Sequence, residues 1–286
     1  MPPASPTLAA WELGRRLKQA RTERDMTSAE AAKSIGITQN YMSNVEYGRR
    51  TIVEEKLRKL IAAYQLDDST RDELLALRDQ STGRGWWSPC TSIYPTELLR
   101  YLGYEHGAAR IRSFENAVMS GLLQSESYAR ALHRGDKANL RMSEVEQRTE
   151  VRMRRKQRLF DDDPLHAQVL LGESVLHQQV GGTGVLAEQL NHLLDLIEQL
   201  PSSLDVRVIP FSAGSYGAMG SSTFHLLNFA SSYLPPIAWQ ETAVSMEIID
   251  SAPMVEKYQA SYEEAAAFAL DREESARLIR SLVPTG

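Results

Sequence analysis

The sequence predicts two domains: an all-helical helix-turn-helix bundle at residues 8–80, and an α+β or α/β domain at residues 88–286 whose N-terminal part is helical. Three observations support this division. The chain has 286 residues, and at about 150 residues per domain it accommodates two hydrophobic cores. The spacing of apolar residues is helical until about His166 and then becomes strand-like. Between the two parts, the polar and glycine-rich run from Ser81 to Gly85 is typical of a linker, which we place at residues 81–87.

Five short helices are predicted in the first domain. The first carries Leu13, Leu17 and Ala20 on its inner face. The second begins after Thr27, whose hydroxyl can cap it. It ends at Gly36, because glycine adopts the left-handed conformation that follows many helices.

The third helix starts at Thr38 and ends near Gly48. The fourth helix has apolar residues at Leu57, Leu60, Ile61 and Tyr64, and the fifth has them at Leu74 and Leu77. We expect Ser69 and Thr70 to cap the fifth helix, because an acidic residue follows each of them by three positions.

The second and third helices, from Ser28 to Tyr47, fit the packing of a helix-turn-helix unit. Ala32 is small enough for close approach of the two helices, and Gly36 suits the turn between them. Four apolar residues fill the joint: Ile35, Ile37, Met42 and Val45.

The segments 27–32 and 37–50 resemble the Xre family of phage-repressor-like regulators, and the resemblance covers about residues 10–66. It implies a lambda-repressor-like bundle that binds DNA through its third helix. One departure is Ser28, where the family commonly has a glutamine that is an important phosphate contact. A shorter serine would anchor the helix more weakly.

The geometry of such a unit assigns the polar residues to two groups. We expect base contacts from the outward amides and hydroxyl of the third helix: Gln39, Asn40, Ser43 and Asn44. We expect phosphate contacts from Ser28, Thr38, Tyr41, Arg49 and Arg50. The alternative is that these side chains only solvate an exposed helix. DNA would repel Glu46, so we interpret it as a structural residue that pairs with a nearby basic side chain.

The charge distribution agrees with a nucleic-acid contact in the first domain. Residues 1–66 carry eleven Lys and Arg against seven Asp and Glu, a net of +4, whereas the net charge of the whole chain is −5. A basic end on an acidic body lets one face meet a polyanion while the remainder repels it.

The composition, with 42% hydrophobic and 24% charged residues, is that of an ordinary folded protein. No stretch approaches about 18 consecutive apolar residues, and the start lacks the features of a secretory leader, so we expect a cytoplasmic protein that does not contact membranes. The single cysteine, Cys90, excludes an intramolecular disulfide and any zinc site that needs two thiolates. The histidines show no ligand-like pairing, and we expect neither a metal nor a cofactor.

Two adjacent tryptophans, Trp86 and Trp87, follow the linker. We expect them to pin the joint onto the second domain, and the alternative is stacking on a ligand. Residues 93–160 are then predicted to be helical, with one helix starting at Pro95 and another at a capping box of Ser143 and Glu146. The arginines of the second of these helices form the candidate face for an acidic partner: Arg152, Arg154, Arg155 and Arg158. The alternative is a solvated helix face.

Strands are predicted from His166 onward, at 167–171, 205–209, 223–229, 237–239 and 246–249. Helices are expected at 185–199 and at 271–282. A further helix is expected to start at a cap formed by Ser261 and Glu264. We interpret this α+β or α/β domain as the effector or sensor domain and as the site of dimerisation.

Two segments come near enzyme motifs without matching them. The glycines of Gly181–Gly184 lack the spacing of a phosphate-binding loop, so we expect only a loop before a helix. Ser215 lies in a run that resembles a nucleophile elbow, but a strand rather than a helix is predicted after it. We therefore expect no catalytic residue and no enzyme.

Several segments of the large domain resemble those of actinobacterial regulators of the WhiJ type: 85–87, 121–130, 148–158, 180–182 and 208–214. The resemblance covers essentially the whole chain. It implies control of development or secondary metabolism, with a small acidic protein encoded nearby as partner, in an antitoxin-like relationship. No ligand or catalytic residue is carried over from it.

The sequence therefore predicts a sequence-specific DNA-binding transcriptional regulator. A homodimer on a palindromic operator is expected, because one recognition helix reads few bases. A small ligand or protein partner would modulate DNA affinity through the C-terminal domain. Two alternatives are an antitoxin-like interaction module that binds DNA only with a partner, and an enzyme fused to a DNA-binding head.

Overall fold

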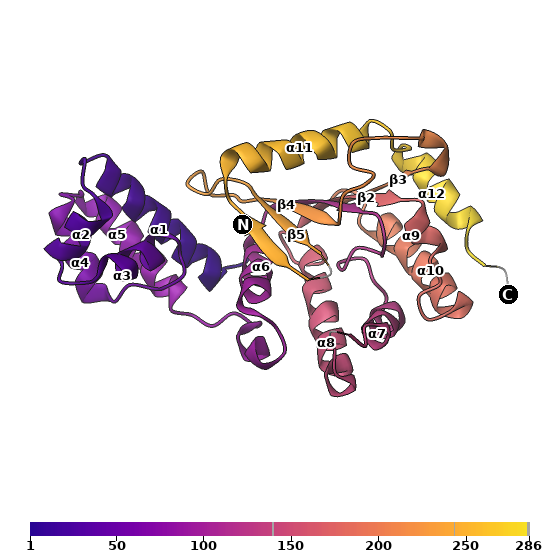
Figure 1. Ribbon diagram of the computed structural model, residues 1–286, viewed down its shortest axis with the longest axis horizontal. Helices are drawn as coiled ribbons and strands as arrows, with labels where there is room; N and C mark the ends of the chain where they lie inside the picture. Colours follow the sequence, from indigo (N-terminus) through magenta and orange to yellow (C-terminus); the bar gives the residue numbers. More distant parts are fainter. Residues whose placement is uncertain (139, 243, 285–286) are drawn as a thin grey trace.

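The computed structural model describes residues 1–138, 140–242 and 244–284, which form two lobes (Figure 1). Residues 1–81 make the helical lobe, a bundle of α1 (Pro6–Thr22), α2 (Ser28–Ser34), α3 (Gln39–Glu46), α4 (Glu54–Ala63) and α5 (Asp68–Ser81). The rest of the described chain forms the larger lobe, a mixed sheet with helices on both faces.

The capping predictions for the helix-turn-helix unit are confirmed. The Thr27 hydroxyl accepts a hydrogen bond from the Glu30 N–H, and the Glu30 carboxylate accepts one from the Thr27 N–H at 2.7 Å. Gly36 follows α2 with a φ of +67°, and Thr38 caps α3. Met42 and Val45 are buried, as expected, in the core that joins the helices.

The prediction for the start of α5 is wrong. The cap is Asp67, whose carboxylate accepts from the Thr70 N–H at 2.8 Å, so the helix begins before Ser69 and Thr70. Asp67 lies two residues before Ser69, and an aspartate caps a helix as well as a serine or threonine does. The helix is therefore longer at its N-terminus than predicted.

The larger lobe contains a six-stranded sheet, among the described residues, in the order β3-β2-β1-β4-β5-β6. The strands are β1 (Arg110–Glu115), β2 (His166–Gly172), β3 (Leu204–Ile209), β4 (Phe224–Asn228), β5 (Ile237–Glu241) and β6 (Met246–Ile249). β1, β2 and β3 are parallel, and the pairs β1–β4, β4–β5 and β5–β6 are antiparallel. All five predicted strands are present.

The structure corrects the prediction that residues 93–160 are helical, because β1 lies within this range at the centre of the sheet. It pairs with β2 on one side and β4 on the other. Its two arginines and one glutamate conceal its strand character in the sequence. Glu115 is buried in the structure, where Thr223 and His225 both contact its carboxylate.

Helices cover both faces of the sheet (Figure 1). On one face lies α11 (Ala252–Ala266). The other face carries α6 (Thr96–Gly107), α7 (Glu126–Gly135), α8 (Val145–Lys156), α9 (Ser174–His177) and α10 (Thr183–Gln199), and α12 (Arg272–Ser281) packs against β3 and α10. Short 3-10 helices lie at Ser88–Ser92, Met142–Glu144, Gln157–Leu159 and Phe211–Ala213.

Two further cap predictions are wrong, and the structure shows one capping box that was not predicted. A 3-10 turn precedes α8, so Ser143 makes no capping box with Glu146. Ser261 lies inside α11. This helix begins at Ala252, after Ser251 and with a proline in its first turn. Asp271 and Glu274 form a capping box at α12.

The joint between the lobes is fixed from both sides. Trp87 is buried in the core of the larger lobe and packs edge-on against His106, so the prediction that the tryptophans pin the joint is confirmed. From the other side, Trp11 of α1 enters the same core, with ring centroids 5.2 Å from Tyr104 and 5.5 Å from Phe229. α1 therefore contributes to the cores of both lobes.

Candidate nucleic-acid interface

α3 is held in the helical lobe by very close contact with α1. A Cβ atom on Gly14 would lie 2.2 Å from the Val45 carbonyl oxygen, and one on Gly48 would lie 2.5 Å from the Cα of Trp11. Gly48 also has a φ of +64°, which favours glycine on its own account. Both ends of the α1–α3 contact thus require the absence of a side chain, which fixes the position of α3.

An ion pair inside the lobe secures the same helix. Arg21 Nε and Nη2 donate to the two carboxylate oxygens of Glu46 at 2.6 and 3.0 Å, and both residues are buried. The hydrogen bond to Glu46 raises the pKa of Arg21. The interpretation of Glu46 as a structural residue is confirmed, and its partner comes from α1.

The four predicted base contacts fall on the first two turns of α3. Gln39 and Asn40 are exposed, and Ser43 and Asn44 are half-buried. Asn44 Nδ2 donates to the Asn40 backbone oxygen at 2.9 Å, so its amide lies along its own helix. Of the four predicted base contacts, Gln39 and Asn40 are consequently the ones most open to solvent.

Four of the five predicted phosphate contacts lie along α3: Thr38 at its N-terminal cap, Tyr41 in its first turn, and Arg49 and Arg50 just after its C-terminal end. The Arg50 guanidinium lies 4.6 Å from the centroid of the Tyr41 ring, and the Arg49 guanidinium lies 5.5 Å from that of Tyr47. The backbone N–H groups of both arginines donate to the Asn44 carbonyl, at 2.8 and 3.2 Å. The exception is Ser28, whose Oγ is covered by neighbouring atoms and would have to rotate to meet a phosphate.

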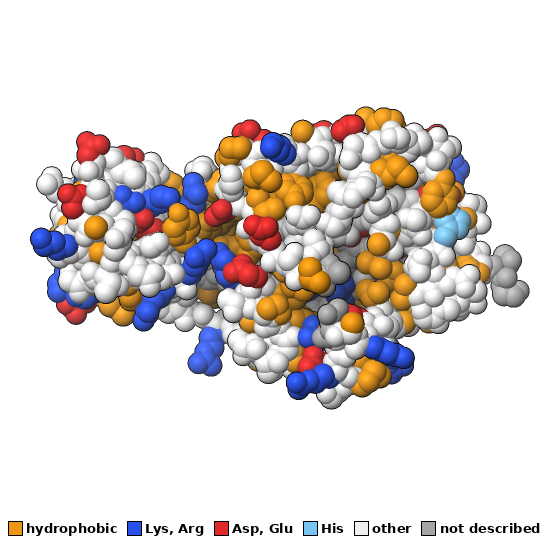
Figure 2. Space-filling view, in the orientation of Figure 1, with side chains coloured by type: hydrophobic (Ala, Val, Ile, Leu, Met, Phe, Trp, Pro, Cys, Tyr) orange, Lys and Arg blue, Asp and Glu red, His pale blue; other side chains and the backbone are white. Residues whose placement is uncertain are grey.

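Two residues that were not predicted from the sequence, Lys18 and Tyr47, also lie at this surface. Lys18 on α1 places its ammonium 5.1 Å from the centroid of the exposed Tyr47 ring, beside Arg49. The outward position of Lys18 next to the buried Leu17 was the available signal. Figure 2 shows Lys and Arg side chains on the helical lobe and at its junction with the larger lobe.

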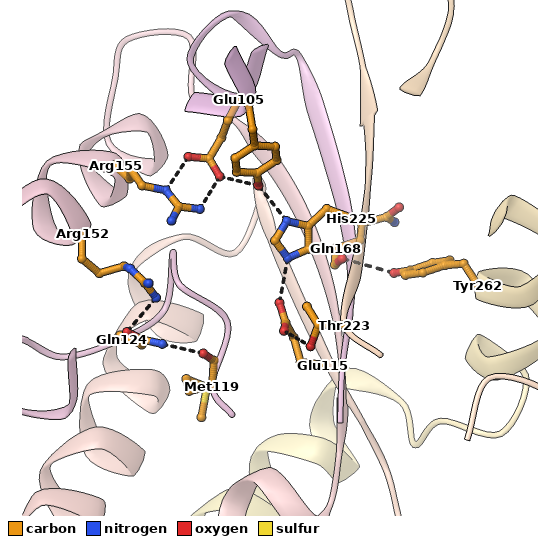
Figure 3. A network of polar contacts seen from close by, with 11 residues as sticks. Glu105, Glu115, Met119, Gln124, Arg152, Arg155, Gln168, Thr223, His225 and Tyr262 are labelled. Carbon is orange, nitrogen blue, oxygen red and sulfur yellow. Dashed lines mark hydrogen bonds and ion pairs between the residues drawn. The ribbon is translucent and has the colours of Figure 1, made fainter. Parts of the chain in front are cut away.

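The predicted partner face on α8 is wrong for three of its four arginines. Arg155 donates to both oxygens of buried Glu105 at 2.8 Å, and Arg158 is 4% exposed and donates to the backbone oxygen of His106. Arg152 donates to Gln124 (Figure 3). Only Arg154 is exposed, over the Trp86 ring. The sequence pattern of a basic helix face does not reveal acidic and carbonyl partners that come from other elements.

Neither of the two near-motifs forms a recognisable catalytic arrangement. Gly182 precedes α10 with a φ of +95°, as expected for a loop before a helix, and Ser215 lies in an exposed connection that leads into β4. Across the described residues, no three or more His, Cys, Asp or Glu side chains are placed to hold a metal ion. The described helices also include none with the length and apolar character needed to cross a membrane.

The fold and this surface define a class of protein: a helix-turn-helix head joined to a larger α/β domain. Residues 98–281 match a domain of unknown function, DUF5753, and the chain belongs to this family. Residues 12–74 match a helix-turn-helix domain.

One relative is an "Uncharacterized HTH-type transcriptional regulator y4aM" from Sinorhizobium fredii (strain NBRC 101917 / NGR234). It is 26% identical over 102 residues, which cover 36% of this chain and 70% of the relative. No solved structure matches this chain.

Proposed function

We propose that this protein is a sequence-specific DNA-binding transcriptional regulator. The observation that carries the proposal is the fixed position of α3, with exposed Gln39 and Asn40 at its start and Arg49 and Arg50 held on tyrosine rings at its end. Amides suit base edges and guanidinium groups suit phosphates. The match to a helix-turn-helix domain and the name of the Sinorhizobium relative support this proposal.

The protein binds as a homodimer in this proposal, because one recognition helix contacts too few bases for a specific site. In vitro selection of the full-length chain on a randomised duplex library tests the function. The expected result is enrichment of a palindrome whose half-sites lie about 34–36 Å apart. A library that remains random after repeated rounds would contradict the proposal, unless the neighbouring acidic protein restores enrichment, in which case the antitoxin-like alternative gains support.

We further propose that the larger lobe modulates DNA binding through α1. The N-terminal cap of α1 is tied to α6, since Ser5 Oγ donates to the Gly103 carbonyl at 2.6 Å. Its middle is tied to the loop after β4, where Arg15 Nε donates to the Tyr233 carbonyl at 3.0 Å. The same helix positions α3 through Gly14. A displacement of α6 would therefore be transmitted to the DNA-reading helix.

A substitution at the α1–α6 contact tests this coupling. A Cβ on Gly103 would lie 2.2 Å from Thr7 Oγ1, so Gly103→Ala must separate α1 from α6. We expect the DNA affinity of G103A to change by about fivefold or more, the range of ordinary allosteric coupling, while the helical lobe stays folded. The matched control is Gly184→Ala, where a Cβ meets nothing within 4 Å. Equal affinities for G103A, G184A and the unmodified chain would contradict the coupling.

We propose that the larger lobe acts by binding rather than by catalysis, since Ser215 lacks the helix that a nucleophile elbow requires. The WhiJ-type resemblance supports a small acidic protein as one such partner. Because Arg155 and Arg158 point inward, its contact surface must lie elsewhere than the proposed face on α8.

A further inference from the structure

The larger lobe contains a cavity of about 730 Å³ between α6, α7, α8 and the β5–β6 connection. We call it the α6–α8 cavity. Its volume is that of pockets that enclose small organic molecules. The lining is mixed, with apolar Leu98, Leu102 and Val151 on one side and Tyr94, His133 and Arg152 among its polar members.

Three arginines of α8 reach this cavity, and two of them have a carboxylate partner. Arg148 pairs with Glu144 at 3.0 Å, and Arg155 pairs with Glu105 at 2.8 Å. Arg152 differs: its Nη1 donates to the neutral amide oxygen of Gln124 at 3.0 Å, and no carboxylate of the described residues lies within ion-pair distance. A partly buried guanidinium without a counterion favours the arrival of an anion.

His133 lines the same cavity and has one ring nitrogen without a partner among the described residues. His133 is 8% exposed, and its Nε2 is buried without a hydrogen-bond partner in the described structure. Burial, with the charges of Arg152 and Arg148 nearby, lowers the pKa of His133 to about 4, so the ring is neutral near pH 7. A neutral imidazole carries one ring proton, and in the tautomer with that proton on Nε2 it can donate a hydrogen bond to an oxygen of a ligand.

Three acidic residues of the described chain line the cavity: Glu97, Asp136 and Glu241. The charge of Asp136 acts on His133, where it opposes the lowering of the pKa by burial. Glu97 is engaged with Arg100 at 3.1 Å. Glu241, on β5, is exposed to solvent, and its charge stabilises the Arg152 guanidinium without an ion pair between the two in the described structure. Positive charge is therefore concentrated on the buried α8 side of the cavity, beside its apolar wall.

We propose that the α6–α8 cavity binds a small organic anion, with its carboxylate or phosphate group at Arg152 and His133 and its apolar portion against α6 and Val151. This inference deepens the proposed regulation, because α6 forms a wall of the cavity and also carries Gly103, the contact for α1. The binding itself requires no DNA.

Calorimetric titration of the full-length chain without DNA tests the site. The probes are octanoate, 2-naphthoate and biphenyl-4-carboxylate, each compared with its neutral carboxamide. The expected result is saturable binding of at least one carboxylate, about tenfold or more tighter than its amide. Arg152→Gln should weaken that binding about tenfold or more.

The matched control is Arg154→Gln, on the same helix but outside the cavity, and it should leave binding unchanged. The melting temperature of R152Q should be no lower than that of the unmodified chain, since an uncompensated cation is removed. Equal affinity of R152Q and R154Q, equal affinity for acids and amides, or no saturable binding by any probe would overturn the proposal. If specific DNA binding persists in any of these cases, the proposed function as a DNA-binding regulator holds and only the proposed ligand site is wrong.

Discussion

At the scale of single residues, the Arg21–Glu46 pair shows how an acidic side chain can serve a DNA-binding helix. Glu46 belongs to α3 but faces inward, where two hydrogen bonds join it to Arg21 of α1. Arg21 also donates to the Met26 carbonyl at 2.6 Å, which holds the turn before α2. One guanidinium thus links three parts of the helical lobe.

Glu46→Ala should destabilise the helical lobe by about 3–5 kcal/mol, because it leaves a buried guanidinium without its counterion. Urea unfolding followed by circular dichroism measures the loss as an earlier first transition. The control is Glu55→Ala, which breaks the exposed pair with Lys59 and should leave that transition unchanged. Identical curves for E46A and E55A would contradict the assigned role.

His133 should make the larger lobe sensitive to acid. Its pKa in the folded chain is about 4, below its ordinary value of 6.5, so the unfolded chain binds the extra proton between these values. Stability is therefore present above about pH 6.5 and is lost as the pH falls toward 4, by on the order of 2 kcal/mol between pH 7 and pH 5. His133→Asn should flatten this dependence of the unfolding free energy, whereas a slope equal to that of the unmodified chain would refute the assignment.

At the scale of elements, the α1–α3 contact depends on Gly14. Gly14→Ala places a methyl group against the Val45 carbonyl, and we expect a loss of about 1–3 kcal/mol in stability together with weaker DNA binding. Gly184→Ala, in the first turn of α10 with open space around it, should instead be neutral or slightly stabilising. Thermal unfolding of the two variants makes the comparison, and a G14A variant as stable as G184A would refute the close contact.

The elements also show what local sequence can and cannot predict. The helix-turn-helix unit follows from signals within a few residues of one another: the Thr27 cap, the Gly36 turn and the apolar joint at Met42 and Val45. The strand β1 was missed because its neighbours in the sheet, β2 and β4, come more than 50 residues later in the chain.

The candidate site divides in the same way. The position of Gln39 and Asn40 on α3 could be predicted from helical spacing alone. The inward direction of Arg155 could not, since its partner Glu105 lies 50 residues away on α6. Likewise, Lys18 reaches the interface only because α1 crosses α3.

At the scale of the whole molecule, α1 joins the two lobes, because it packs into the hydrophobic core of each. Trp11 is buried among aromatic rings of the larger lobe, while Leu13 and Leu17 are buried in the helical lobe. Residues 82–286 carry 19 Lys and Arg against 25 Asp and Glu, a net of −6, whereas residues 1–81 carry a net of +1, so the larger lobe repels DNA and leaves the helical lobe to meet it. A ligand or partner that moves the larger lobe would change both the position and the electrostatic surroundings of α3.

The most direct test of the central claim is fluorescence anisotropy of Gln39→Ala on the selected duplex and on a scrambled duplex, at two salt concentrations. The control is Gln199→Ala, an exposed amide at the end of α10. If α3 reads DNA, Q39A loses about 1–3 kcal/mol on the selected duplex, keeps its affinity for the scrambled one, and retains the salt dependence of the unmodified chain. Equal losses on both duplexes, or no difference between Q39A and Q199A, would contradict the claim.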